Sequence, residues 1–288
     1  MLPNLIIIGA MKSATSSLHY YLRFHPDISM SHQKELNFFA EEDTSCVNSK
    51  SQNKGLEWYK SNFNEISFVR GESSPSYTFY PRHIGVPRRM HSVIPNAKLI
   101  YIVRDPIERM LSHYVHNVHR GRERRRAEDA LLDPNEIYLA VSSYYMQIAQ
   151  FLNYYPRQQI LIVSTEELFS RRLETLKVIF NYLGVHSDFH TEKFAERRHL
   201  SSSKRRRTLA AEFLFKAGGV AKKYIPISEA VRSRVKSLIE ARLTSPIERP
   251  ELTDDLRREI ASALSEDVAK FRRFAGREFG EWKWASEY

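Results

Sequence analysis

Short, continuous apolar runs alternate along the chain with longer segments in which apolar residues recur at helical spacing. The apolar runs are Leu5 to Ile8, Ile66 to Arg70, Lys98 to Val103 and Gln159 to Ser164. Runs of this length, bounded by turn residues, are typical of strands that are buried on both faces. We therefore predict a central sheet whose strands are mostly parallel.

Helical spacing occupies the segments between these runs. Helices are predicted over Thr15 to Phe24, from Pro106 onward, over Ile137 to Tyr155 and over Leu168 to Leu183. Asp105 followed by Pro106 supplies an N-cap and a first helical residue, and Gly184 supplies a helix end. Strands that alternate with helices imply right-handed crossovers. The predicted fold class is therefore α/β, with three layers in which helices flank the sheet and with a helical C-terminal part.

The chain has 288 residues, of which 42% are hydrophobic, so it can bury one large core. The pattern becomes helical and polar from about residue 195. We predict a single domain over residues 1–288, with residues 195–288 as a helical C-terminal extension of it. The only cysteine, Cys46, excludes an internal disulfide and favours a reducing compartment. The N-terminal apolar run is too short for export or for a membrane span, so we expect a cytoplasmic protein.

Positive charge dominates the chain, with a formal net charge of +10 and an isoelectric point near 9.6. This excess favours an anionic partner, such as nucleic acid, a membrane surface or a phosphorylated or sulfated small molecule. The densest basic runs are RGRERRR, over Arg120 to Arg126, and KRRR, over Lys204 to Arg207. Such runs also occur as solvated loops that only keep a protein soluble, so their position relative to other anion-binding features decides their meaning.

The first apolar run leads directly into GAMKSATSS, residues 9–17, and then into a helix. Anions bind at such corners of parallel sheets, because the helix dipole and the first N–H groups of the helix favour negative charge. The groups available are the N–H groups of Ser13 to Ser16, the Lys12 ammonium and the hydroxyls of Thr15, Ser16 and Ser17. The glycine directly before the lysine of a Walker A motif is missing, and no strand ends in an Asp suited to magnesium. The sequence therefore predicts a phosphate site, but not a standard nucleotide-kinase loop.

A second phosphate position is predicted beside the first. Arg104 directly follows the strand KLIYIV, and Ser112 lies in the second turn of the next helix. If this strand neighbours the first one, both side chains converge on one phosphate, and an arginine binds two phosphate oxygens at once. An arginine at a strand end also pairs commonly with a carboxylate, which is the alternative interpretation.

Four motifs, in this order, resemble those of the sulfotransferases that use PAPS (3′-phosphoadenosine 5′-phosphosulfate). The motifs are GAMKSATSSL, KELNFF, GESSPSYTFYP and KLIYIVRDPIERMLSHY. The similarity is to the branch that contains the heparan sulfate N- and O-sulfotransferases and many bacterial relatives, and it extends from Leu5 to the closing GREFGEWKW. It implies a P-loop-like fold, PAPS as co-substrate, PAP as product and no required metal.

The resemblance also implies which residues hold the nucleotide. The residues matching the 5′-phosphosulfate loop are Lys12, Ser13, Ala14, Thr15, Ser16 and Ser17. Those matching the 3′-phosphate site are Arg104 and Ser112. The basic loop that closes over the nucleotide corresponds to KRRR, which implicates Lys204, Arg205 and Arg206. Ala14 stands where the family commonly has glycine, and because a positive φ is costly for alanine, we expect a loop conformation that alanine tolerates.

The same resemblance implies the catalytic groups. Glu35 matches the glutamate of a K-E-x-x-F-F motif that acts as the catalytic base, and Lys34 is its basic partner. A carboxylate between a lysine and two phenylalanines could be partly desolvated, which would raise its pKa toward neutrality. The alternative is a surface ion pair followed by two core aromatics. Lys12 is suited to stabilise the leaving oxygen, and Glu72 and Asn37 are assigned to acceptor binding.

Two other functions compete with the sulfotransferase interpretation. A P-loop-like kinase would need magnesium ligands that the sequence does not supply, and a polyanion-binding protein would not explain Lys12 and Arg104 at strand ends. Three histidines spaced by three, from His113 to His119, are interpreted as a hydrated helix face rather than a metal site. A glycan, a lipid, a phenol or a secondary metabolite would each fit as acceptor. We predict no nucleic-acid partner and no membrane span, and the sequence leaves the oligomeric state open.

Overall fold

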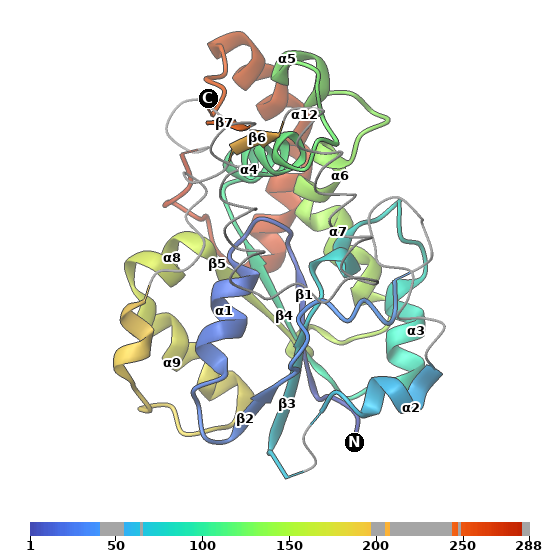
Figure 1. Cartoon of the computed structure of the whole chain (residues 1–288), viewed down its shortest axis with the longest axis vertical. Helices are drawn as coiled ribbons and strands as arrows, with labels where there is room; N and C mark the ends of the chain where they lie inside the picture. The colour runs from blue at the N-terminus through green and yellow to red at the C-terminus, as the bar shows by residue number, and fades with distance from the viewer. Residues whose placement is uncertain (41–54, 64–65, 197–204, 208–243, 247–248, 284–288) are drawn as a thin grey trace, which may run out of the picture.

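The computed structural model describes residues 1–40, 55–63, 66–196, 205–207, 244–246 and 249–283. Its centre is a five-stranded sheet in the order β2-β3-β1-β4-β5 (Figure 1). The strands are β1 (Leu5–Gly9), β2 (Ile28–Met30), β3 (Val69–Ser73), β4 (Lys98–Val103) and β5 (Ile160–Ser164). Each neighbouring pair is parallel, which confirms the predicted α/β fold with a parallel sheet.

The observed β3 lies three residues further along the chain than predicted. Ile66 and Phe68 are 93% and 64% exposed, so the apolar run begins outside the sheet. The strand itself continues into Gly71, which pairs with Leu5 of β1. A Cβ atom at Gly71 would lie 2.4 Å from the sulfur of Met30, so any larger residue here would require the Met30 side chain to move. β2 was not predicted, because three residues are too few to show a period.

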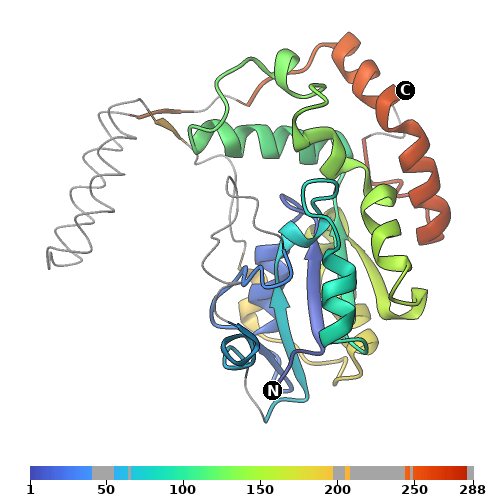
Figure 2. The same ribbon diagram turned by 90° about the vertical axis from the view of Figure 1, so that its right-hand side faces the viewer.

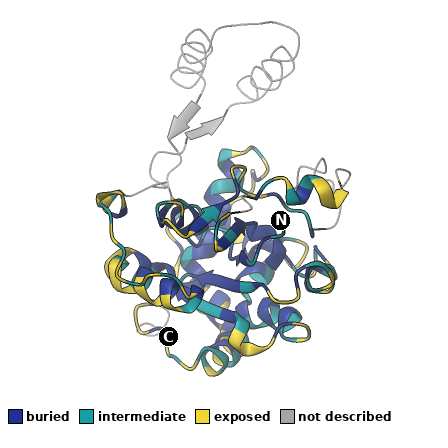
Figure 3. Ribbon diagram, turned by 90° about the horizontal axis from the view of Figure 1, so that it is seen from below, coloured by how far each residue is buried: buried dark blue, intermediate teal, exposed yellow. Residues whose placement is uncertain are grey.

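Helices cover both faces of the sheet, because alternate residues of each strand point to opposite sides. One face carries α1 (Thr15–Leu22), α8 (Thr165–Ser170) and α9 (Arg172–Leu183), which pack on Leu5 and Ile7. The other carries α3 (Val86–Val93), α4 (Pro106–His119), α6 (Ile137–Ser142), α7 (Tyr144–Leu152) and α12 (Asp254–Ala275), which pack around Ile6 and Ile8. Figure 2 shows α12 running along the outside of α7. Figure 3 shows the resulting layers, with the sheet buried and the outer faces of the helices exposed.

Short elements complete the described part of the chain. They are α2 (Gly55–Lys60), α5 (Ala127–Ala130), the 3₁₀ turns over Pro75–Thr78, Arg157–Gln159 and Glu192–Ala195, and the antiparallel pair β6 (Arg205–Arg207) and β7 (Thr244–Pro246). In the part of the chain that the structure describes, no helix combines the length and the apolar character needed to cross a bilayer. The helical C-terminal part is represented by α12, and the single-domain organisation stays a prediction.

Two of the predicted helices are each divided in two. The first, over residues 137–155, breaks at Ser143, where Asp267 of α12 accepts hydrogen bonds from Tyr145 N and Met146 N at 2.9 and 2.7 Å. This carboxylate caps the new helix from a segment more than 100 residues away, so the local pattern could not reveal the break. The second, over residues 168–183, is α8 and α9, separated at Arg171.

The helix after β4 begins as predicted. Asp105 accepts a hydrogen bond from Glu108 N at 3.0 Å, and Pro106 is the first helical residue. Gly184 ends α9 as predicted, and it does so in the left-handed conformation.

Candidate functional site

Three of the motif segments follow the carboxyl ends of three neighbouring strands. β1 lies between β3 and β4, and all three run in the same direction. The loop that contains Lys12 follows β1, the segment 74–78 follows β3, and Arg104 follows β4. The carboxyl ends of parallel strands form one edge, where ligands of such sheets bind. The condition set from the sequence, that the strand before Arg104 neighbours the first strand, is met, and the binding role of these residues stays a prediction.

The loop after β1 is a tight turn at the start of α1. Ala10 N donates to Ile102 O of β4 at 2.6 Å, and Ser13 N donates to Ala10 O at 3.2 Å. Lys12 and Ala14 both have positive φ, 70° and 60°. The expectation that the loop would spare Ala14 this conformation is wrong, because Ala14 is the left-handed N-cap residue of α1. Because the Ser13 N–H is used inside the turn, it is not available to an anion. Of the N–H groups predicted to face an anion, those of residues 14–16 remain.

The hydroxyl groups of this loop fit an anion. Ser13 is fully buried, and among the described residues its Oγ has no hydrogen-bond partner. A buried hydroxyl without a partner is costly, and a phosphate or sulfate oxygen would satisfy it. Thr15 and Ser17 are also buried, whereas Lys12 and Ser16 are partly exposed.

Arg104 pairs with a carboxylate at the second predicted phosphate position. Its Nη2 lies 3.0 Å from Glu108 Oε2, and Arg249 Nη2 lies 2.6 Å from the other oxygen of Glu108. Burial alone would raise the pKa of Glu108, but the hydrogen bond and charge of Arg249, together with the charge of Arg104, hold it below its ordinary value. Ser112 is buried one turn and a half into α4, on the helix that Arg104 precedes. The structure therefore shows the carboxylate pairing of Arg104, and its binding of a phosphate stays a prediction.

The KELNFF loop is fastened to the segment after β3. Glu35 N donates to Ser73 O at 3.0 Å, and Asn37 N donates to Ser74 Oγ at 3.0 Å. The side chain of Asn37 is used as well, since its Oδ1 accepts from Ser76 Oγ at 2.5 Å and its Nδ2 donates to Glu35 O at 2.9 Å. Asn37 therefore shapes the loop, and its assignment to acceptor binding stays a prediction.

Glu35 and Lys34 form an ion pair, with Lys34 Nζ 2.5 Å from Glu35 Oε1. The side chain of Glu35 is 53% exposed, so the expected desolvation of its carboxylate is not found. Phe39 is buried, and the Phe38 ring stacks on Tyr59 with centroids 4.3 Å apart. The motif therefore has the arrangement of the alternative interpretation, an exposed ion pair followed by aromatic residues that pack on the core. Half-exposure also leaves the carboxylate within reach of an acceptor molecule.

Glu72 is fully buried at the end of β3. Burial raises its pKa to about 7, although the hydroxyls of Tyr77, Tyr59 and Ser74 lie near enough to oppose the shift. Neither carboxylate oxygen makes a hydrogen bond within the part of the chain that the structure describes. The prediction that Glu72 contacts the acceptor does not agree with this burial. The side chain lies beside Tyr59 and Tyr77, which belong to an aromatic cluster with Phe38 and Phe39.

The family model of the sulfotransferase domain matches residues 2–245. The chain belongs to the sulfotransferase family. A crystal structure of a sulfotransferase from Alicyclobacillus acidocaldarius covers 98% of this chain and 99% of that one, with a TM-score of 0.69 and 24% identity. This likeness confirms the predicted P-loop-like sulfotransferase fold.

Two relatives illustrate the similarity in sequence. Human heparan sulfate glucosamine 3-O-sulfotransferase 5 is 31% identical over 198 residues, which cover 64% of this chain and 54% of that protein. The membrane-associated sulfotransferase kil1 of Dictyostelium discoideum is 40% identical over 118 residues, which cover 39% of this chain and 22% of that protein. The matched segments thus span between about a fifth and about half of the length of these curated relatives.

In this sulfotransferase, one residue near the first loop was missed from the sequence and another was misjudged. Arg109 is fully buried in α4, and nothing in the sequence distinguished it from the other arginines. His113 is only 2% exposed, so the interpretation of a hydrated histidine face is wrong for it. Burial and the charges of Arg109, His116, Lys12 and Arg82 lower its pKa well below the ordinary value, so it is neutral at physiological pH.

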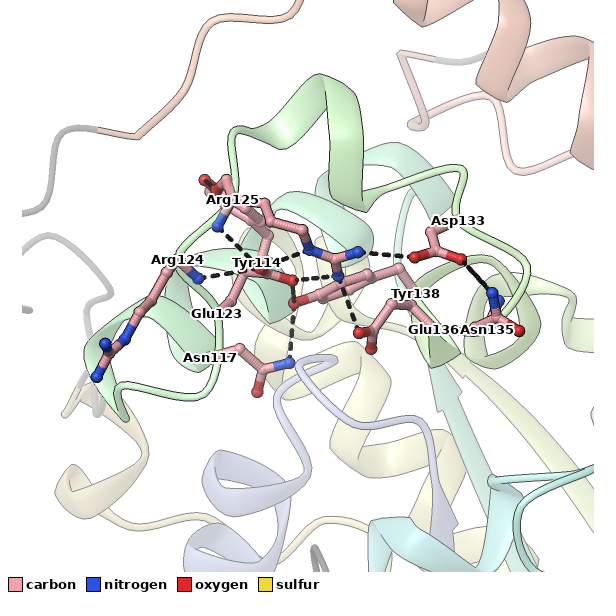
Figure 4. Close-up of polar contacts among 9 residues, drawn as sticks. All are labelled: Tyr114, Asn117, Glu123, Arg124, Arg125, Asp133, Asn135, Glu136 and Tyr138. Atoms are coloured by element: carbon pink, nitrogen blue, oxygen red, sulfur yellow. Dashed lines mark hydrogen bonds and ion pairs between the residues drawn. The ribbon is translucent and has the colours of Figure 1, made fainter.

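One arginine of the run RGRERRR, Arg125, forms ion pairs within the protein. Figure 4 shows the Arg125 guanidinium against three carboxylates, those of Glu123, Asp133 and Glu136, at 2.9, 2.7 and 2.9 Å. Glu123 also accepts from Tyr138 at 3.3 Å. Arg125 therefore fastens the segment after α4 to the start of α6, whereas Arg120 and Arg122 are exposed.

The predicted basic loop near the C-terminal part is described only in part. Lys204 lies outside the described residues, and the structure describes only the backbone of Arg205 and Arg206, in β6. β6 lies beside α4, the helix that carries Ser112 (Figure 1). No cluster of three or more potential metal ligands occurs in the described ranges.

Proposed function

We propose that this chain transfers a sulfuryl group from PAPS to a hydroxyl or an amine of an acceptor and releases PAP. The observation that carries the proposal is the placement of two anion-binding features after adjacent strands. The Lys12–Ser17 loop follows β1, and Arg104 with Ser112 follows β4, which pairs directly with β1. A nucleotide with a 5′-phosphosulfate and a separate 3′-phosphate matches two such positions.

The residues of the first loop fit the 5′ end of this donor. Ser13 Oγ is buried and has no hydrogen-bond partner among the described residues, and Thr15 and Ser17, in the first turn of α1, are buried as well. The helix dipole of α1 adds positive potential at its first turn. We assign the 5′-phosphosulfate to this loop, and the 3′-phosphate to Arg104 and Ser112.

When bound, PAPS supplies a sulfuryl group activated by its bond to a phosphate oxygen. Lys12 is assigned to stabilise the negative charge that remains on that oxygen when the bond breaks. Glu35 is assigned to take the proton of the acceptor hydroxyl or amine as the new bond to sulfur forms, so the proton ends on its carboxylate. Lys34, whose Nζ lies 2.5 Å from Glu35 Oε1, is assigned to orient this carboxylate.

For the acceptor we propose a glycan. The support is the name of the human relative, which acts on heparan sulfate glucosamine. The exposed arginines Arg120 and Arg122 at the end of α4 would attract an anionic glycan toward the same edge of the sheet.

The test is a transfer assay with radiolabelled PAPS and purified protein. The acceptor panel would hold desulfated heparan oligosaccharides, a simple phenol and a sterol. Label transferred to the oligosaccharide without added metal supports the proposal in full. Label transferred only to the phenol or the sterol would overturn the glycan assignment, and absence of transfer to every acceptor, with PAPS left intact, would contradict the proposed activity.

A further inference from the structure

Arg109, in the first half of α4, is a fully buried arginine. Its exposed fraction is 0%, and within the described ranges it forms no ion pair with any carboxylate. Burial lowers its pKa to about 10, so it still carries its charge at neutral pH. Buried charges in proteins are normally paired, because an unpaired charge loses its hydration without compensation. A missing counter-charge at this position is therefore unusual.

The partners of Arg109 come from the segments around the predicted donor site. Its side chain donates to Ser142 Oγ at 2.5 Å and to Tyr138 O at 2.7 Å, both in α6. It also donates to His113 Nδ1 of α4 at 3.3 Å and to Met11 O of the first loop at 3.5 Å. All these acceptors are neutral. Arg109 thus joins the first loop to α4 and α6, and among the described residues no carboxylate compensates its charge.

Among the described residues, the neighbouring arginines Arg104 and Arg249, unlike Arg109, pair with a carboxylate. Glu108, the residue before Arg109, pairs with Arg104 and Arg249 instead. Arg104 is close enough for its charge to lower the pKa of Arg109, and the charge of Lys12 acts on His113 beside it. Arg109 therefore lies within the positive potential of Arg104 and near that of Lys12. An anion bound at either predicted phosphate position would reduce the charge repulsion on Arg109.

We propose that Arg109 is a positioning residue that fastens the first loop to α4 and supplies a buried positive charge for the phosphate groups of the donor to neutralise. The inference rests on the proposed function for the identity of the donor. The charge itself calls for an anion of the phosphate class whatever nucleotide carries it.

The experiment compares Arg109→Met, which removes the charge, with Arg109→Lys, which keeps it. Arg109→Gln is a second uncharged variant that retains hydrogen bonding, in case the methionine variant does not fold. Arg70→Met is the matched control, because Arg70 also donates to main-chain oxygens, those of Leu2 and Ser67, but lies at the opposite edge of the sheet. Calorimetry would give the affinity of each variant for PAP and for inorganic pyrophosphate, and thermal unfolding would report the fold.

We expect the uncharged variants to lose affinity for both ligands by about tenfold or more, and Arg109→Lys to retain most of it. Arg70→Met should bind like the wild type. Equal losses in Arg109→Lys and the uncharged variants would overturn the charge claim and leave a packing role, and wild-type affinity in Arg109→Gln would overturn the proposal altogether. If the wild type binds pyrophosphate but not PAP, the proposed function fails, while the pyrophosphate series still decides the role of Arg109.

Discussion

Arg104 Nη2 lies 3.0 Å from Glu108 Oε2, one turn further along the same segment. The carboxylate engages one end of the guanidinium, which has five N–H donors, so the remaining donors stay free of this pair. Because Arg249 binds the other oxygen of Glu108, the three groups together carry one net positive charge. Glu108 thereby orients Arg104 without cancelling the positive charge of the site.

This relationship predicts that lysine cannot replace Arg104. Arg104→Lys should weaken PAP binding by about tenfold or more, because an ammonium lacks the planar fork with which a guanidinium binds two phosphate oxygens while another N–H faces Glu108. AMP, which has no 3′-phosphate, should be affected much less. Calorimetric titration of both nucleotides measures the difference.

The matched control is Arg171→Lys, since Arg171 forms the same kind of pair with Glu167, four residues earlier, at 2.8 Å. It should leave both affinities unchanged. An equal loss for PAP and AMP in Arg104→Lys would place the 3′-phosphate elsewhere.

Glu35→Gln should lower kcat by roughly 10²- to 10⁴-fold, because the amide cannot accept the proton of the acceptor. The affinity for PAP should not change, since the carboxylate is assigned to the acceptor side. Glu57→Gln is the control, because Glu57 is an exposed glutamate that pairs with Lys60 at 2.7 Å. Steady-state kinetics with radiolabelled PAPS would measure both. A normal kcat in Glu35→Gln would remove Glu35 from the mechanism.

Ala14→Gly should stabilise the protein. Ala14 has φ 60°, a conformation that glycine adopts without the clash of a Cβ atom. The expected gain is about 1 kcal/mol, or roughly 2–4 °C in Tm for a protein of this size. Ala149→Gly, within the regular helix α7, should instead cost about 0.5–1 kcal/mol. Thermal unfolding of the two variants tests the assignment, and a lower Tm for Ala14→Gly would contradict it.

Glu72 should make the stability depend on pH. Because burial raises its pKa from 4.5 to about 7, the folded protein holds a proton in this range that the unfolded chain releases. The stability contributed at this position therefore falls as the pH rises from 4.5 to about 7, by about 3 kcal/mol in total, and stays low above that.

Glu72→Gln removes this dependence, so the variant should match the wild type near pH 4.5 and unfold at a higher temperature at pH 8. Glu266→Gln, at an exposed helix position, should behave like the wild type at both values. Thermal unfolding at the two pH values gives the comparison. A constant difference between Glu72→Gln and the wild type would show that Glu72 does not titrate in this range.

The sequence predicted the parts of the site that follow strand ends. The run KLIYIV and the Asp105-Pro106 helix start are local signals, and their positions carry Arg104 and Ser112 with them. Residues whose role depends on distant segments could not be recognised. Arg109 looks like any arginine of an amphipathic helix until α6 covers it, and Asp267 caps a helix far away in the chain.

Exposure was the other quantity that the sequence misjudged. Glu35 was expected to be partly desolvated and Glu72 to contact an acceptor, whereas Glu35 is half-exposed and Glu72 is fully buried. Aromatic residues follow each of them within a few positions, Phe38 after Glu35 and Tyr77 after Glu72. The aromatic cluster encloses Glu72 and not Glu35 because of the way the KELNFF loop packs on the end of β3. This packing joins segments that are distant in the sequence, so no local pattern reveals it.

The most direct measurement is a calorimetric titration of the wild-type protein with PAP, without metal, beside ATP with magnesium. We expect PAP to bind clearly more tightly than ATP with magnesium, because the two anion-binding positions match a 5′-phosphate and a 3′-phosphate. Tighter binding of ATP that requires magnesium would contradict it and would favour a kinase.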